Sequence, residues 1–156
     1  MAFRALRYPC RPDMGTVFRP ARAADAAELA GLSEELGYPA SAAELELRLA
    51  HLLTDDDHAV FVAEDGAILG WVHVQRFLSL ASDPVGLVTG LVVTEPARRQ
   101  GIGRELMQRV ETWARARGLE SIRLRSRVER SGAHAFYTRL GYAVAKQQLQ
   151  FRKDLG

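Results

Sequence analysis

The sequence predicts an α/β fold of the α+β kind, with a mixed, mostly antiparallel sheet of about six or seven strands flanked by about four helices. Three observations support this prediction. Short apolar segments with the two-residue period of strands alternate along the chain with segments that have the period of a helix. Turn and cap residues separate these segments. The 156 residues contain no internal repeat and no linker, which indicates a single domain.

The first expected elements are a short strand and two helices. Residues 17–19 favour a strand, and residues 25–36 place three leucines on one helical stripe, after which Gly37 provides a left-handed cap. Ser41 and Glu44 form a capping box, S-x-x-E, at the start of a second helix. The leucines of these two helices are Leu29, Leu32, Leu36, Leu45, Leu49, Leu52 and Leu53.

The middle of the chain favours strands, followed by a long helix. Strands are expected at residues 59–63, 68–77 and 85–93, with a hairpin turn at Asp65-Gly66 and a loop over residues 80–84. A helix is expected over residues 101–117, and a further strand over 122–126. The inward positions of the long helix are Ile102, Leu106, Val110 and Trp113.

The C-terminal segment predicts one more helix and a closing pair of strands. Ser131 is expected to cap a short helix, which Gly141 ends. Residues 142–145 and 147–152 are expected to form an antiparallel pair. Residues 1–15 have no periodicity, so we expect a flexible N-terminal extension before a single domain that spans residues 16–156.

Composition narrows the class of protein. No apolar run approaches the roughly 20 residues that cross a bilayer, and the basic first residues lack the apolar stretch of a secretory signal. We therefore expect a soluble, cytoplasmic protein without a membrane partner. The only cysteine, Cys10, cannot form an internal disulfide, and no Cys/His spacing suggests a metal site. Abundant Ala and Arg with little Lys is typical of bacterial proteins from GC-rich genomes.

Charge is unevenly distributed although the net charge is only +2. Residues 25–65 are acidic, with Arg48 as their one Lys or Arg, whereas residues 98–130 are rich in arginine. The acidic segment should favour cations and the arginine-rich segment anions. Each of these charges taken singly also fits a solvated helix face. A nucleic-acid binder is the reading that the arginines suggest, but no nucleic-acid motif or aromatic–basic pattern accompanies them. We therefore expect no nucleic-acid partner.

The most informative segment joins the strand at 85–93 to the long helix. Gly101 and Gly103 lie at the first turn of that helix, where the absence of side chains permits close approach. Free backbone N–H groups and the helix dipole make such a turn an anion site, and three arginines add positive charge. A pyrophosphate fits this description. The spacing differs from the dinucleotide fingerprint and from the P-loop.

These residues resemble a family pattern. The segment Arg98-x-x-Gly101-x-Gly103, after an apolar strand, is similar to the acetyl-CoA-binding motif of the GNAT acyltransferases. A second block, which includes Phe136-Tyr137 and ends in Gly141-Tyr142, resembles the later GNAT motif, and residues 18–25 resemble the start of that fold. The resemblance covers roughly residues 16–152 in the family order.

The resemblance implies the GNAT acyltransferase fold and acetyl-CoA as co-substrate, with no metal. The strand that ends at Val93 would diverge from the strand at Ile122. The pantetheine arm of CoA would pair with the backbone of the strand that ends at Val93. An amide near Leu91 would polarise the thioester carbonyl. The implied CoA-binding residues are Leu91, Val92, Val93, Arg98, Arg99, Gln100, Gly101, Ile102, Gly103 and Arg104. Arg130 stands where many relatives have Asn and is a further candidate contact.

Two side chains are candidates for proton transfer. Tyr137 matches the family tyrosine that protonates the departing CoA thiolate, a task suited to a phenol with a pKa of about 10. The alternative is a core aromatic residue. Many relatives place a Glu on the strand before the loop, but residues 85–93 have no carboxylate, and Thr89 is no strong base. His73, on the strand face of Trp71 and Gln75, is the best substitute as general base.

Other readings of the base stay open. His73 could be a histidine with a structural hydrogen bond only. Asp83 or Glu64 could act through water, or the amine could transfer its proton without a dedicated base.

We expect the chain to be an acetyl-CoA-dependent N-acetyltransferase. The acetyl group would pass to a primary amine by direct attack in a ternary complex. In this fold the acceptor meets the acidic first helices, so a cationic amine is expected: a polyamine, an aminoglycoside-like compound, an amino-acid derivative or a protein amine. A homodimer is common among GNAT proteins. The main alternative is a non-catalytic CoA-binding sensor with the same fold.

Overall fold

The computed structural model describes residues 15–156. They belong to two compact units, of which the first ends at Leu124 and the second comprises Arg125–Gly156; each is described by itself. The expected N-terminal extension and Cys10 lie outside the described residues, except for Gly15. A single domain over residues 16–156 stays a prediction.

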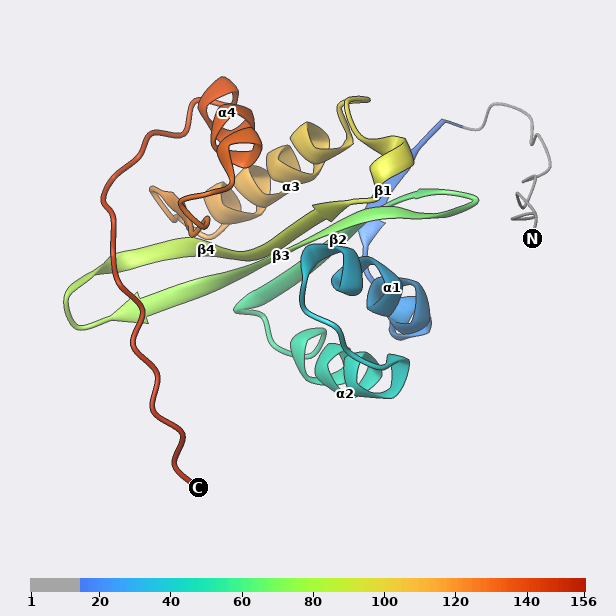
Figure 1. The fold of residues 1–156 in the computed structure, drawn as a ribbon, viewed down its shortest axis with the longest axis horizontal. Helices are drawn as coiled ribbons and strands as arrows, with labels where there is room; N and C mark the ends of the chain where they lie inside the picture. Colours follow the sequence, from blue (N-terminus) through green and yellow to red (C-terminus); the bar gives the residue numbers. More distant parts are fainter. Residues whose placement is uncertain (1–14) are drawn as a thin grey trace. The chain divides into compact units, whose positions relative to one another are not determined.

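The first unit is built on a mixed sheet of five strands in the order β1-β2-β3-β4-β5 (Figure 1). The neighbours from β1 to β4 are antiparallel, and β5 runs parallel to β4. The sheet is therefore mostly antiparallel, as the sequence predicts, but it has five strands among the described residues instead of the expected six or seven. The strands are β1 Val17–Pro20, β2 His58–Asp65, β3 Ala67–Ser79, β4 Ser82–Val93 and β5 Ile122–Leu124.

Three helices cover the two faces of this sheet (Figure 1). A 3-10 turn, Ala23–Asp25, leads into α1, Ala26–Leu36, and α2 spans Ala42–Leu52. Both pack on one face, and α3, Ile102–Ala116, covers the other. Local rules explain the ends of α1 and α2, because Gly37 adopts a left-handed φ of 93° and Ser41 and Glu44 form the expected capping box.

Each face has its own apolar core. The face of α1 and α2 buries a cluster that includes Leu29, Leu32 and Leu49 from the helices and Val60 and Val62 from β2. On the other side the inward residues of α3 are fully covered, as their helical spacing predicts. They include Leu106, Met107 and Val110, each 0% exposed. The two cores fix the middle of β3 and β4 between helices, which is where the candidate site lies.

The β3–β4 hairpin differs from the prediction. The loop expected over residues 80–84 is wrong, because β3 continues to Ser79 and β4 already begins at Ser82. Pro84 misled the prediction, since proline cannot donate a ladder hydrogen bond. Here β5 pairs with β4 only from Gly86 onward, so this part of β4 is an edge where proline is tolerated. The Asp65-Gly66 turn is confirmed, with φ of 71° at Gly66.

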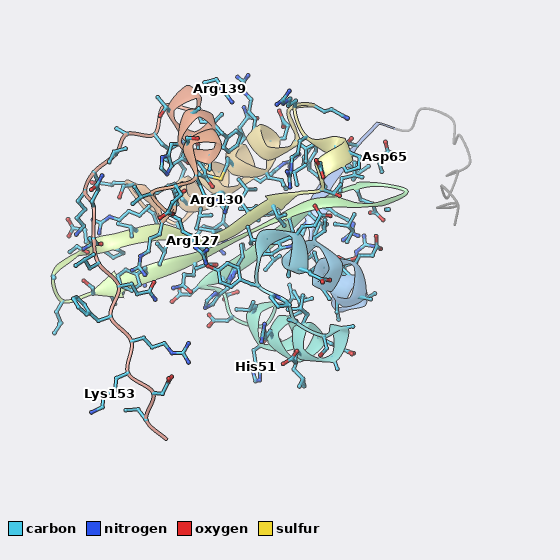
Figure 2. All side chains as sticks on the ribbon, in the orientation of Figure 1. His51, Asp65, Arg127, Arg130, Arg139 and Lys153 are labelled. Atoms are coloured by element: carbon cyan, nitrogen blue, oxygen red, sulfur yellow. The ribbon has the colours of Figure 1, made fainter. Side chains whose placement is uncertain are left out.

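The second unit contains α4, Ser131–Arg139, whose side chains include Arg139 (Figure 2). Arg130 is the N-cap residue, so Ser131 begins the helix instead of capping it. The predicted closing pair at 142–145 and 147–152 is wrong, because residues 142–156 form no strand. Their alternating apolar residues fit a strand, but a strand also needs a partner with free backbone groups, which periodicity cannot specify.

Within residues 15–156, no helix combines the length and the apolar character that crossing a membrane requires.

Candidate active site

The loop between β4 and α3 has an unusual backbone. After a short 3-10 turn, Glu95–Ala97, Arg99 adopts a φ of 63°, and Gly101 adopts a φ of 81° just before α3 begins. Arg99 is the one non-glycine residue with positive φ among those the structure describes. Such a conformation costs free energy and is concentrated at ligand-binding loops. It turns the chain sharply so that α3 starts immediately after Gly101.

The first amides of α3 have no protein acceptor. Glu105 N donates to Gly101 O over 3.0 Å, which is the first hydrogen bond of the helix. In the part of the chain that the structure describes, no acceptor pairs with the amides of residues 99–104. Unsatisfied N–H groups at a helix N-terminus carry partial positive charge and attract anions. The loop therefore has the unpaired amides that an anion site requires, and the binding of an anion there stays a prediction.

Arg98 connects the loop to the end of β4 and to α1. Its Nε donates to Val93 O over 2.9 Å, and its Nη2 lies 3.8 Å from Glu35 Oε2 on α1. Thr94 Oγ1 donates to the same carboxylate over 3.0 Å. Arg98 therefore positions the loop, whereas Arg99 and Arg104 have no ion pair among the described residues. Sequence reasoning missed Glu35 and Thr94, because their contact with the loop joins residues far apart in the chain.

The edge of β4 is open beside this loop. β5 pairs only with Gly86, Leu87 and Val88, so residues 89–93 have no strand on that side within the described sheet. Thr94 N donates to Leu69 O, and antiparallel pairs alternate in their hydrogen bonding. The backbone groups of Leu91 and Val93 therefore point away from β3, toward the open edge. The pairing stops where β5 ends at Leu124, so the divergence of the two strands that the resemblance implies stays a prediction.

A β-bulge lies just beyond the part of β4 that pairs with β5. His73 pairs with Gly90 and Val74 pairs with Val88, so Thr89 is the extra residue of β4. Its exposed side chain turns onto the face of α1 and α2, where Oγ1 lies 2.8 Å from His73 Nδ1. Sequence reasoning dismissed Thr89 as too weak a base and had no signal for the bulge.

His73 is half-buried and has two hydrogen-bond partners. Besides Thr89, its Nε2 lies 3.0 Å from His58 Nδ1. Burial, reinforced by the nearby His58, lowers the pKa of His73 from 6.5 to about 4. The ring is therefore neutral at pH 7, and the ordinary pKa on which its choice as general base rested does not apply.

The other base candidates lie elsewhere. Glu64 is ion-paired with Arg19 Nε at 2.7 Å, and this contact lowers the pKa of Glu64. Its carboxylate is therefore engaged in holding β1 to β2. Asp83 is exposed near the start of β4, six residues before the bulge.

Tyr137 and Arg130 belong to the second unit. Burial raises the pKa of Tyr137 above 10, and the positive charge of Arg130 opposes that shift. The Tyr137 ring packs edge-on against Phe136 and Tyr142, with centroids 5.1 and 6.0 Å away. The phenol is thus protonated at neutral pH, as an acid must be. Arg130 lies at the start of α4, near Arg127 (Figure 2).

Comparison with known proteins identifies the family. A model of the acetyltransferase (GNAT) family matches residues 25–142. The chain is 34% identical over 143 residues to an aminoglycoside N(6')-acetyltransferase type 1 of Stenotrophomonas maltophilia, which covers 88% of this chain and 92% of the relative. It is 36% identical over 108 residues to an aminoalkylphosphonate N-acetyltransferase of Salmonella typhimurium, covering 68% of each chain.

Solved structures show the same fold. The aminoglycoside acetyltransferase AAC(6')-Iy, in complex with the bisubstrate analogue CoA-S-monomethyl-acetylneamine, superposes with a TM-score of 0.79 at 19% identity. The superposition covers 90% of this chain and 99% of that one. The chain is therefore an acyltransferase that belongs to the GNAT acetyltransferase family.

Proposed function

We propose that the chain transfers an acetyl group from acetyl-CoA to a primary amine of a small cationic molecule, by direct attack in a ternary complex. One observation carries the proposal: a loop of unpaired amides at residues 99–104 lies beside the open edge of β4. An anion site and an unpaired strand edge suit the two parts of CoA, a diphosphate and an amide-containing arm.

The residues present fit the co-substrate. The amides of residues 99–104 would hold the pyrophosphate, with Arg99 and Arg104 adding charge. The Leu91 C=O and the Val93 N–H would pair with the pantetheine amides, whereas Val93 O already accepts a hydrogen bond from Arg98 Nε. The Val92 side chain, in contrast, is only 5% exposed and belongs to the core. It would therefore support the edge of β4 without contacting CoA. Arg98 positions the loop, and Arg130 is proposed as a further contact.

The chemistry requires one bond to form and one to break. The amine nitrogen attacks the thioester carbonyl, and the C–S bond then breaks. Charge that develops on the carbonyl oxygen would be stabilised by the Leu91 N–H, a contribution of about 3 kcal/mol in comparable sites. We propose Tyr137 as the acid that protonates the leaving thiolate, supported by its family motif and its raised pKa.

A cationic acceptor is supported by charge and by the relatives. Residues 25–65, which include α1 and α2, carry eleven acidic side chains against the single Arg48. The named relatives acetylate aminoglycosides and an aminoalkylphosphonate. The acidic helices favour a polycationic acceptor such as an aminoglycoside over an anionic phosphonate, because like charges repel.

A panel of amines tests this proposal. Purified chain would be incubated with acetyl-CoA and with an aminoglycoside, a polyamine, an amino-acid amide or an aminoalkylphosphonate, and released thiol would be measured. We expect the polycationic amines to give the highest kcat/KM. Turnover only with anionic amines would contradict the acceptor class. Binding of CoA without any transfer would favour the non-catalytic sensor, which the lack of a carboxylate on residues 85–93 supports.

A further inference from the structure

A row of polar side chains crosses the sheet on the face of α1 and α2. Thr89 Oγ1 lies 2.8 Å from His73 Nδ1, and His73 Nε2 lies 3.0 Å from His58 Nδ1. His58 Nε2 in turn lies 3.7 Å from Asp55 Oδ2. Each imidazole thus contacts one neighbour with each of its nitrogens. The row runs from the bulge in β4, across β3, to the start of β2.

Asp55 gives this row a direction. At 3.7 Å the contact is longer than a hydrogen bond, but a carboxylate attracts positive charge and so favours a proton on the facing His58 Nε2. With both rings neutral, His58 Nδ1 is then an acceptor for a proton on His73 Nε2. His73 Nδ1 is left as the acceptor for the Thr89 hydroxyl. The oxygen of Thr89 keeps a lone pair for a further donor.

The two ends of the row reach solvent, whereas its middle is half-buried. Thr89 is exposed just beyond Val88, the last residue of β4 that pairs with β5, and two residues before Leu91. An amine that attacks a thioester held at Leu91 must approach this part of the strand. At the other end, the Asp55 side chain is 55% exposed, so it exchanges protons with water.

We propose that Thr89, His73, His58 and Asp55 form a proton relay that carries the proton of the attacking amine to solvent. The inference rests on the proposed acetyl transfer. As the N–C bond forms, the amine gives a proton to Thr89 Oγ1, whose own proton passes to His73 Nδ1. His73 Nε2 gives its proton to His58 Nδ1, and His58 Nε2 gives one to solvent water beside Asp55. One proton leaves the amine and one reaches solvent.

The relay explains how a neutral histidine can serve this reaction. A ring that resists protonation is a poor store for a proton, but it can accept one on one nitrogen while it releases another from the opposite nitrogen. Neither imidazole has to carry a positive charge after the transfer. Exchange with water at the exposed ends restores the starting arrangement.

Substitution of Thr89 tests the first link. In single-turnover reactions, Thr89→Val should lower the rate of acetyl transfer by about 100-fold, the lower end of the range for lost proton transfer. Thr89→Ser retains the hydroxyl and should stay within about threefold of the wild-type rate. The control is Thr112→Val on α3, where the hydroxyl donates only to Gln108 O. The dissociation constant for CoA should be the same in all three variants.

His58→Gln tests the far end, with His51→Gln at the exposed end of α2 as its matched control (Figure 2). The wild type should show a solvent deuterium isotope effect with a curved proton inventory, because several protons move together. His58→Gln should slow transfer and make the inventory linear. His51→Gln should change neither.

A measurement without turnover tests the arrangement itself. Nitrogen-15 spectra of the histidine rings should show both His58 and His73 protonated on Nε2, and Thr89→Val should change the spectrum of His73. Protonation of His73 on Nδ1 in the resting protein would overturn the relay. The relay would also be overturned if Thr89→Val and His58→Gln transferred acetyl groups at the wild-type rate with the wild-type proton inventory. If the wild type binds CoA but acetylates no amine, the proposed function fails, and the relay fails with it.

Discussion

A side chain at position 90 would collide with Trp71: a Cβ built on Gly90 lies 2.7 Å from Cη2 of the indole and 2.8 Å from Cζ3. Glycine is therefore required by close packing and not by a special φ. The indole lies over the β4 backbone, one residue from Leu91, and its Nε1 is buried without a partner among the described residues. Trp71 thus supports the strand edge at the point where the acetyl group would lie.

Gly90→Ala should therefore make the folded chain less stable. We expect the free energy of unfolding to fall by about 1–3 kcal/mol, because the indole must shift within a packed core. Gly31→Ala is the control, since nothing lies within 4 Å of a Cβ at that position in α1. Helix propensity should make that variant slightly more stable. Urea denaturation measures the free energy of unfolding of both variants, and equal stability of the two would contradict the packing argument.

The pair Arg19–Asp25 should contribute strongly to stability. Both guanidinium nitrogens bind the carboxylate, at 2.8 and 2.9 Å, and the side chains are only 12% and 9% exposed. Asp25→Asn removes the charge of the carboxylate that both Nη atoms bind, leaving the buried guanidinium with Glu64 as its remaining ion pair, and should lower the free energy of unfolding by about 3 kcal/mol.

The matched control for that substitution is Arg152→Gln, which breaks an exposed ion pair with Asp154. Surface pairs of this kind contribute about 0–1 kcal/mol. Thermal unfolding distinguishes the two variants, and a similar small loss in both would show that the Arg19 pair is not a structural anchor.

His73 should make the chain less stable in mild acid. Its pKa in the folded chain is about 4, against 6.5 for the free side chain, so the unfolded chain binds more protons between these values. The free energy of unfolding should therefore fall as pH decreases from 6.5 to about 4, by about 1–3 kcal/mol in total. Asp25, whose pKa is lowered from 3.8, loses its contribution only at still lower pH.

His73→Gln should flatten the dependence on pH in that window. Urea unfolding from pH 7 to pH 4 measures it. An unchanged slope in the variant would show that other groups cause the loss of stability.

Tyr137→Phe should lower turnover without weakening CoA binding. Removal of the hydroxyl abolishes the proposed acid and should reduce kcat by about 100-fold, while the ring still packs against Phe136 and Tyr142. Steady-state kinetics and calorimetry of CoA binding measure the two effects separately. A larger loss in affinity than in kcat would indicate a packing role instead.

The sequence predicts what depends on neighbouring residues. Gly37, the Ser41–Glu44 box and the Asp65-Gly66 turn follow from local backbone rules, and the loop before α3 follows from its glycines and arginines. The relay could not be predicted, because it depends on the register of three strands and on the bulge at Thr89. The closing strands failed for a related reason, since a strand depends on a partner elsewhere in the chain.

Titration calorimetry of acetyl-CoA into the purified chain tests the central claim most directly. We expect saturable binding of one molecule per chain. Gly103→Asp should weaken that binding by at least about 100-fold, because it places negative charge against the pyrophosphate. Gly103→Asn, which adds similar bulk without charge, should weaken it less. No saturable heat with the wild type, or equal affinity in Gly103→Asp, would contradict the proposed site.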